Sequence, residues 1–213
     1  MMHMYDRAKK HFKKTDPHLY KAARDIEIEE ITLSQDLFRD IVWTIVGQQL
    51  SSRAADAIFT RFLTLFTAEE ITPHLLLKLP DEAMRGSGLS MAKVRAIKAF
   101  AAAVERKELT LLKLETSTDE DVIAELTKVK GIGPWTAEMV LMFSLARPDI
   151  FSRGDLGLRK GMMELYGLRQ PPSERRFREL LSAWTPYRTY AARILWKISD
   201  RKTKRVGRKR AAK

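Results

Sequence analysis

The sequence predicts an all-α protein, and three observations support this prediction. Apolar residues recur at helical spacing in many segments of the 213 residues. No run shows the strict alternation of apolar and polar residues that is typical of a half-buried strand. No stretch matches the glycine pattern of a Rossmann or P-loop fold. About nine or ten helices are therefore expected, with no clear linker between them.

The N-terminal quarter of the chain predicts two long helices after a short one. Residues 1–18 are mixed in character and contain four closely spaced lysines. Leu19 to Ile31 reads as a short helix and a connector. A long helix is expected from about Leu37 to Leu50, because apolar residues recur there at i, i+3, i+4, i+7 and i+8. A second long helix begins near Ser52.

The middle of the chain alternates between turns and helices. Prolines and glycines interrupt residues 67–90, so short helices and turns are expected there. Ser90 is a good N-cap for a helix from Met91 to about Arg106. Thr118 or Asp119 is placed to cap the helix that leads to Lys128. An almost wholly apolar helix should follow from about Pro134 to Ala146.

Two further helices are expected near the C-terminus. Ser173 follows two prolines and begins an amphipathic helix. Thr185-Pro186 has the cap-then-proline pattern of a helix start, so the last helix is expected from there. Residues 201–213 hold eight basic residues and no acidic one. This composition predicts a disordered tail.

The composition limits the classes of function. The chain has no cysteine, which excludes disulfides, cysteine nucleophiles and cysteine-ligated zinc or iron–sulfur clusters. The net charge of +12 favours a polyanionic partner, most often nucleic acid. Subtracting the eight tail charges leaves +4, so a soluble protein with a basic tail is the alternative. No signal peptide and no apolar run near the ~20 residues of a membrane span are visible. We therefore expect no membrane partner and an intracellular protein.

A compact glycine turn, Gly131-Ile132-Gly133-Pro134, lies between two predicted helices. Glycines permit backbone conformations that other residues avoid and leave nearby amides uncovered. Exposed amides at a helix start bind phosphate well, and Lys128 and Lys130 add positive charge. The alternative is an ordinary turn between helices. About twenty residues later, Asp155 stands at a predicted helix start, where its spacing alone favours a structural N-cap.

The whole string from Leu126 to Ala137, L-x-x-V-x-G-I-G-P-W-T-A, resembles the helix-hairpin-helix motif of DNA repair enzymes. Together with Asp155, it resembles the helix-hairpin-helix DNA glycosylase superfamily from about residue 35 to residue 200. The strings GIGPWTA and Ile45-Val46-Gly47-Gln48-Gln49-Leu50-Ser51 are most similar to the 3-methyladenine DNA glycosylase II family. The resemblance is to the compact form of the family, so the N-terminal β-rich domain of longer members is not expected here.

This resemblance implies two helical lobes with an active-site cleft between them. One lobe is expected to combine residues 1–34 with 130–200, and the other to comprise 35–129. Bifunctional members carry a lysine at the position of Trp135, where it forms a Schiff base and cleaves the strand. Because this chain has tryptophan there, the resemblance implies a monofunctional glycosylase without lyase activity.

The resemblance also assigns roles to individual residues. Asp155 becomes the catalytic carboxylate, and the expected base pocket comprises Trp135, Met139, Trp43 and Trp184. The loop Gln48, Gln49, Leu50 and Ser51 enters the minor groove, with Gln49 or Leu50 as the wedge. Further expected DNA contacts are Lys93, Lys128, Lys130, Gly131, Ile132, Gly133 and Thr136. The carbonyls of Thr127, Val129 and Gly131 would hold a structural Na⁺ or K⁺, and no other cofactor is required.

The predicted function is removal of alkylated purines from double-stranded DNA by a monomeric enzyme. The expected substrates are 3-methyladenine and 7-methylguanine, extending to ethenoadenine or hypoxanthine. The enzyme would act in the cytoplasm or nucleoid of a bacterium or archaeon, or in the nucleus of a eukaryote. Two alternatives stay open, a noncatalytic helix-hairpin-helix DNA-binding protein and a glycosylase for another damaged base.

Overall fold

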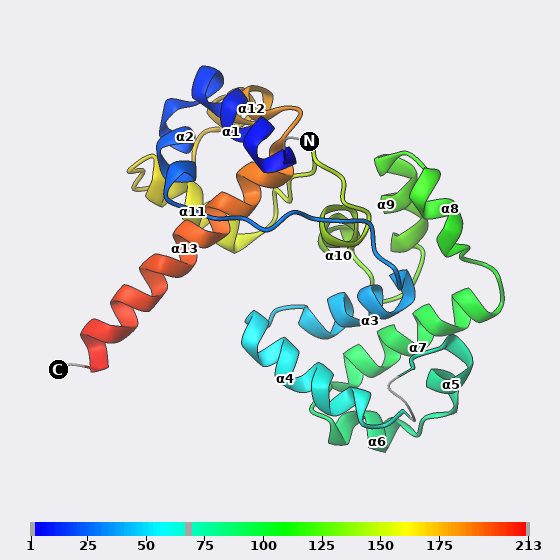
Figure 1. Cartoon of the computed structure of the whole chain (residues 1–213). Helices are drawn as coiled ribbons and strands as arrows, with labels where there is room; N and C mark the ends of the chain where they lie inside the picture. The colour runs from blue at the N-terminus through cyan, green and yellow to red at the C-terminus, as the bar shows by residue number, and fades with distance from the viewer. Residues whose placement is uncertain (1–2, 67–69, 212–213) are drawn as a thin grey trace. The chain divides into compact units, whose positions relative to one another are not determined.

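The computed structural model describes residues 3–66 and 70–211, and within them it confirms the all-α prediction (Figure 1). These residues form thirteen α-helices and one π-helix, and they contain no strand. The chain divides into two compact units, one of residues 1–31 with 147–213 and one of residues 32–146. None of the helices in the described ranges combines the length and apolar character needed to cross a membrane.

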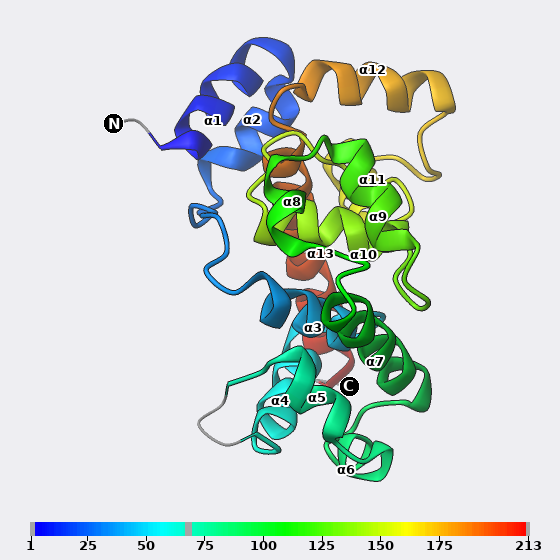
Figure 2. The same ribbon diagram turned by 90° about the vertical axis from the view of Figure 1, so that its right-hand side faces the viewer.

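The central unit is built around α7 (Met91–Glu105), which contacts α3 (Leu37–Gly47) and the short helices α5 (Pro73–Lys78) and α6 (Asp81–Gly86) (Figure 1, Figure 2). The rings of Phe38 and Phe100 stack with centroids 5.0 Å apart where α3 meets α7. The other helices of this unit are α4 (Ser52–Leu63), α8 (Leu111–Thr116), α9 (Asp119–Thr127), α10 (Pro134–Met139) and the π-helix η2 (Val140–Ser144).

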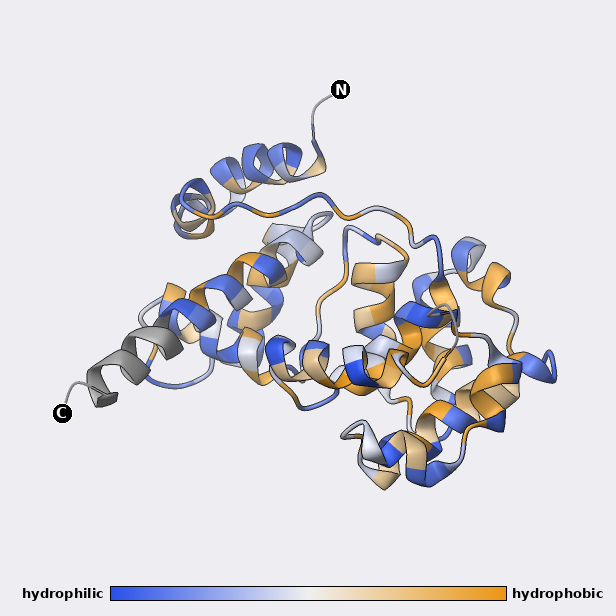
Figure 3. Cartoon of the chain, turned by 60° about the horizontal axis from the view of Figure 1, so that its bottom comes forward, coloured by the Kyte–Doolittle hydropathy of each residue, from blue (hydrophilic) through white to orange (hydrophobic). Residues whose placement is uncertain are grey.

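The other unit joins the two ends of the chain. Its helices are α1 (Met4–Thr15), α2 (Pro17–Arg24), α11 (Leu156–Leu165), α12 (Glu174–Trp184) and α13 (Arg188–Ala211). Helix α13 packs against α11, and both also contact α2. Phe12, Leu19 and Trp184 are wholly buried in its core. Blue and orange residues alternate along most helices in Figure 3, as expected when each helix buries one face.

Short polar side chains define where many of the helices begin. In eight of the described helices, an N-cap Ser, Thr or Asp accepts a hydrogen bond from the backbone amide three residues later. Such a cap satisfies one of the amides that lack a partner at a helix start. The predicted caps Ser90 and Thr118 are confirmed. The others are Asp16, Asp36, Ser51, Thr72, Asp155 and Ser173.

Several predicted helix ends are wrong by a few residues. Helix α3 ends at Gly47 rather than Leu50, because Gln49 adopts a left-handed backbone with φ of 58°. The apolar helix stays α-helical only to Met139 and continues as the π-helix η2. The last helix begins at Arg188 rather than at Pro186, since the Asp149 carboxylate accepts the Arg188 amide and also pairs with its guanidinium.

The predicted tail and domain boundary also differ from the structure. Helix α13 continues through Ala211, whereas disorder was expected after Asp200. Lysine and arginine have good intrinsic helix propensity, which agrees with a helix in this basic segment. The first lobe boundary lies within three residues of its prediction, but the second lies after Ala146 rather than at 129. The reason is that α10 and η2 pack against α9 and α3 of the central unit.

Candidate functional site

Asp155 is held firmly at the start of α11. Its Oδ1 accepts hydrogen bonds from the backbone amide of Leu158 at 2.8 Å and from the indole Nε1–H of Trp196 at 2.9 Å. The structural N-cap expected from the spacing is therefore confirmed. Hydrogen bonds to a carboxylate are stronger than neutral ones, and the positive end of the helix dipole favours a negative charge here. The result is a half-buried carboxylate whose orientation is set by two donors.

Two glycines explain how Trp196 reaches this carboxylate. A Cβ at Gly161 would lie 2.3 Å from the carbonyl oxygen of Leu195, and one at Gly157 would lie 2.9 Å from Cδ1 of Trp196. Only a residue without a side chain lets α11 and α13 approach so closely. The sequence analysis indicated neither a role for Gly157 nor the hydrogen bond from Trp196 to Asp155. The spacing of small residues at i and i+4 signals close helix packing, but it does not name the partner.

The glycine turn between α9 and α10 has the expected hairpin form, with unequal roles for its two glycines. Gly131 has φ of +96°, and a Cβ there would lie only 2.4 Å from Cβ of Ala96 in α7. Gly133 is extended, with φ of −101°, and no heavy atom lies within 4 Å of where its Cβ would be. Gly131 is thus required by conformation and packing, whereas Gly133 leaves open space beside the hairpin amides. Ile132 is buried and anchors the turn.

The loop between α3 and α4 is tied to this hairpin through Gln48. Its Nε2 donates to the carbonyl of Gly131 at 3.1 Å and to Oγ1 of Thr136 at 3.0 Å. Gln48 and Thr136 were expected to contact DNA, but the structure pairs them with each other, and Thr136 is buried. The exposed tip of the loop consists of Gln49 and Leu50, both candidates for the wedge.

The remaining residues predicted to contact DNA around this loop and hairpin differ in the partners that they have within the protein. Ser51 caps α4 by accepting the amide of Ala54. Lys93 donates from Nζ to the carbonyl of Val46 at 2.7 Å, and burial lowers the pKa of its ammonium group. This hydrogen bond supports the C-terminal end of α3, and the predicted contact of Lys93 with DNA stays a prediction. Lys128 pairs with the exposed Glu125, and such surface pairs exchange readily. Lys130 is exposed and has no ion-pair partner among the described residues.

The four residues predicted for a base pocket fall into two groups. Trp135 is half-buried in the first turn of α10, Met139 is buried one turn later, and Trp43 is 37% exposed on α3. These three belong to the central unit. Trp184 does not fit the prediction, because it is wholly buried in the other unit and donates from Nε1 to Oδ2 of Asp16 at 2.8 Å. Its apolar periodicity reflects a core position.

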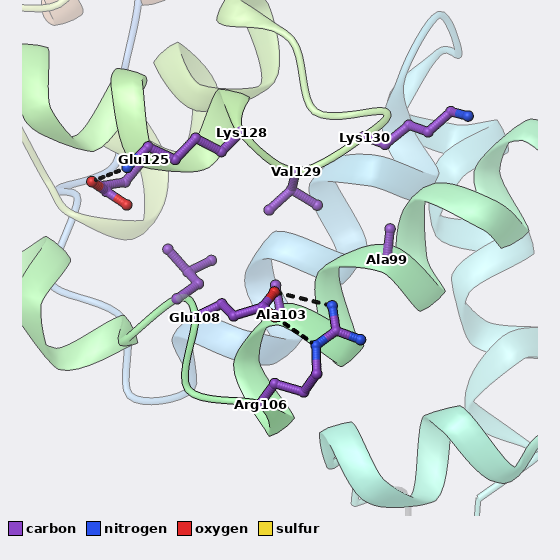
Figure 4. Close-up of a pocket in the computed structure, with 9 residues that line it drawn as sticks. Ala99, Ala103, Arg106, Glu108, Glu125, Lys128, Val129 and Lys130 are labelled. Atoms are coloured by element: carbon purple, nitrogen blue, oxygen red, sulfur yellow. Dashed lines mark hydrogen bonds and ion pairs between the residues drawn. The ribbon is translucent and has the colours of Figure 1, made fainter.

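A recess of about 300 Å³ lies beside the hairpin (Figure 4). Two ion pairs, Arg106 with Glu108 and Glu125 with Lys128, stand on its rim. Its lining comprises Ala99, Ala103, Arg106, Glu108, Leu109, Glu125, Lys128, Val129 and Lys130. None of the predicted base-pocket residues lines it, and four of its five charged residues are paired with one another. We therefore do not assign the recess as the base pocket.

The helical fold, the hairpin and the capped aspartate together define a class of DNA repair protein. The sequence matches the HhH-GPD superfamily of base-excision DNA repair proteins over residues 42–186. This match covers more than half of the chain, and the chain belongs to this superfamily. The matched region begins within α3 and ends at Pro186, so it contains the loop, the hairpin and Asp155.

Individual relatives within the superfamily carry the name of 3-methyladenine glycosylases. The chain is 35% identical over 164 residues to DNA-3-methyladenine glycosylase 1 of Schizosaccharomyces pombe, covering 76% of this chain and 72% of the relative. Its fold is similar to that of S. pombe 3-methyladenine DNA glycosylase (Mag1) in complex with abasic DNA, with a TM-score of 0.79, 31% identity, and 90% and 95% of the two chains covered. It is also similar to a Bacillus halodurans DNA-3-methyladenine glycosidase, with a TM-score of 0.75, 36% identity, and 90% and 88% covered.

Proposed function

We propose that this chain is a monofunctional DNA glycosylase that removes alkylated purines and so initiates base-excision repair. The observation that carries the proposal is Asp155, a single carboxylate oriented by two donors in a chain of the HhH-GPD superfamily. The names of its relatives support 3-methyladenine as a substrate. We include 7-methylguanine, ethenoadenine and hypoxanthine in the range to be tested. The enzyme would act inside the cell as a monomer on damaged double-stranded DNA.

The chemistry assigned to Asp155 is electrostatic. Breaking an N-glycosidic bond builds positive charge on the deoxyribose, and a fixed carboxylate beside C1′ stabilises that charge. The same group is suited to orient or deprotonate the attacking water. An alkylated purine such as 7-methylguanine already carries positive charge and leaves easily. A second carboxylate acting as general acid, as in many sugar hydrolases, is therefore not needed.

The target base has to leave the duplex before it reaches such a carboxylate. A cationic base binds well to an aromatic face, so Trp135 is the proposed platform. Met139 would add an adaptable apolar surface, and Trp43 supplies an exposed indole on α3. Because the position of Trp135 holds no lysine, we expect no Schiff base and no strand cleavage from this residue.

The hairpin and the loop would hold the duplex. We assign the open amides around Gly133, with the charge of Lys130, to a backbone phosphate. Gln49 or Leu50 would fill the gap that the flipped base leaves, as side chains inserted through the minor groove do. The carbonyls of Val129 and Gly131 each accept one hydrogen bond, which leaves each a second lone pair. With Thr127, they fit a structural Na⁺ or K⁺.

The test uses duplexes that contain 3-methyladenine, 7-methylguanine, ethenoadenine or hypoxanthine. The wild type should release free base and leave an unnicked abasic site. Asp155→Asn should still bind DNA but lose at least about a hundredfold in single-turnover rate. Asparagine is also a good N-cap, so stability should change little. Asp36→Asn is the matched control, because Asp36 caps α3 in the same way through its side chain.

A noncatalytic DNA-binding protein is the second candidate, because Asp155 does serve as a helix cap. Release of no damaged base by the wild type, combined with salt-sensitive DNA binding, would favour this candidate. Undiminished excision by Asp155→Asn would overturn the assigned role of the carboxylate. Trapping of a protein–DNA adduct by borohydride would contradict the absence of lyase activity.

A further inference from the structure

Gln48 forms a bridge between two parts of the central unit that are distant in sequence. It is the first residue after α3 and begins the loop whose exposed tip is Gln49 and Leu50. Its carboxamide nitrogen has two hydrogens and reaches two acceptors in the hairpin region, the carbonyl of Gly131 and the hydroxyl of Thr136. One side chain thus joins the candidate wedge loop to both sides of the glycine turn.

The bridge connects the hairpin with the loop after α3, and helix α7 also holds both of these elements in place. The hairpin is anchored by the left-handed Gly131, which lies directly against Ala96 of α7. The same helix α7 supplies Lys93, whose ammonium group donates to the carbonyl of Val46 at the end of α3. Between these supports, Gln49 holds a left-handed conformation that is uncommon for a residue with a side chain. The loop is therefore braced at its base while its tip stays exposed.

We propose that Gln48 is a positioning residue that couples the wedge loop to the hairpin. Binding of a DNA phosphate at the hairpin would then fix the loop in the geometry that enters the duplex. This inference rests on the proposed function, because it assigns the loop to base flipping. It differs from a purely structural role, in which Gln48 would only contribute to the stability of the fold. Coupling predicts that flipping is impaired when the bridge is lost, even though phosphate binding persists.

The experiment compares Gln48→Met with the wild type. Methionine keeps the length of the side chain but has no N–H donor, so both hydrogen bonds are lost. Gln35→Met is the control, because Gln35 is an exposed glutamine of the same unit. Three quantities are measured: affinity for undamaged duplex, fluorescence of a 2-aminopurine beside the target base, and single-turnover excision of 7-methylguanine, both paired in a duplex and unpaired in a bulge.

We expect Gln48→Met to lower excision from the paired site and the 2-aminopurine signal by about tenfold, the effect of losing one to two hydrogen bonds. Excision from the bulge and affinity for undamaged duplex should fall less than about threefold, because the bulged base needs little flipping. Equal losses on paired and bulged substrates, or no difference from Gln35→Met, would overturn the coupling. If the wild type releases no base, the proposed function fails, and the 2-aminopurine signal still decides the coupling.

A second pair of variants guards against a folding defect in Gln48→Met. Thr136→Val removes the hydroxyl acceptor with almost no change of shape, whereas Thr136→Ser retains it. We expect Thr136→Val to reproduce the selective loss in flipping and Thr136→Ser to behave like the wild type. Combining Gln48→Met with Thr136→Val should add little to either change alone, because both remove the same contact. Simple additivity of the two losses would contradict the bridge.

Discussion

Replacing Trp196 with phenylalanine tests whether the indole orients the catalytic carboxylate. The substitution keeps a ring in place and removes the Nε1–H that donates to Oδ1 of Asp155 at 2.9 Å. A hydrogen bond to a charged group contributes about 1.5–3 kcal/mol. In the transition state the carboxylate faces developing positive charge. If most of the free energy of this hydrogen bond stabilises the transition state, its loss lowers the rate of single-turnover excision by about ten- to a hundredfold. The free energy of unfolding should fall by only about 1 kcal/mol, because Trp196 is half-buried.

Trp184→Phe is the matched control for this prediction. Its indole also donates to a carboxylate, Oδ2 of Asp16 at 2.8 Å, but the ring is wholly buried. Its loss should cost about 2–4 kcal/mol of stability and leave the excision rate of the folded protein unchanged. Trp184→Phe should therefore have the larger loss of stability, and Trp196→Phe the larger loss of excision rate. Equal excision rates for both variants, measured at saturating enzyme below their melting temperatures, would refute the orienting role of Trp196.

Three further predictions follow from the hairpin, the tyrosines and the C-terminal tail. Gly131→Ala should lower the free energy of unfolding in urea by more than about 2 kcal/mol. The alanine would have to adopt a left-handed backbone, and its Cβ would clash with Ala96. Gly133→Ala should leave stability within about 1 kcal/mol but weaken DNA binding; the reverse pattern would contradict the assigned roles. Burial raises the pKa of Tyr5 and of Tyr190 to about 12. The stabilisation that follows from this shift is therefore complete below pH 10, and the free energy of unfolding decreases as the pH rises from 10 to 12. Tyr5→Phe should flatten this alkaline decrease, and an unchanged pH profile would count against it. Truncation after Asp200 removes eight basic residues and should weaken binding and its salt dependence while sparing single-turnover excision. A large loss of that rate would indicate another role for the tail.

The sequence predicted most of the architecture because the signals are local. Apolar periodicity identifies α3, α4, α7 and α12, and short polar residues mark where several of them begin. The prediction of helix ends was wrong where a residue distant in sequence determines where a helix begins. The start of α13 depends on Asp149, which caps and pairs with Arg188 across 39 positions. Helix α13 extends to Ala211, beyond the point where composition predicts the ordered chain to end.

The candidate site divides in the same way. The sequence by itself determined the hairpin motif and the N-cap position of Asp155, because each depends on neighbouring residues. Only the tertiary structure decided that Trp196 donates to Asp155, that Gln48 reaches Gly131 and Thr136, and that Trp184 belongs to a core. Helical periodicity specifies which face of a helix is buried, but not which distant side chain meets it. The contacts that orient the carboxylate and brace the loop span 41 and 83 positions and arise from packing between helices.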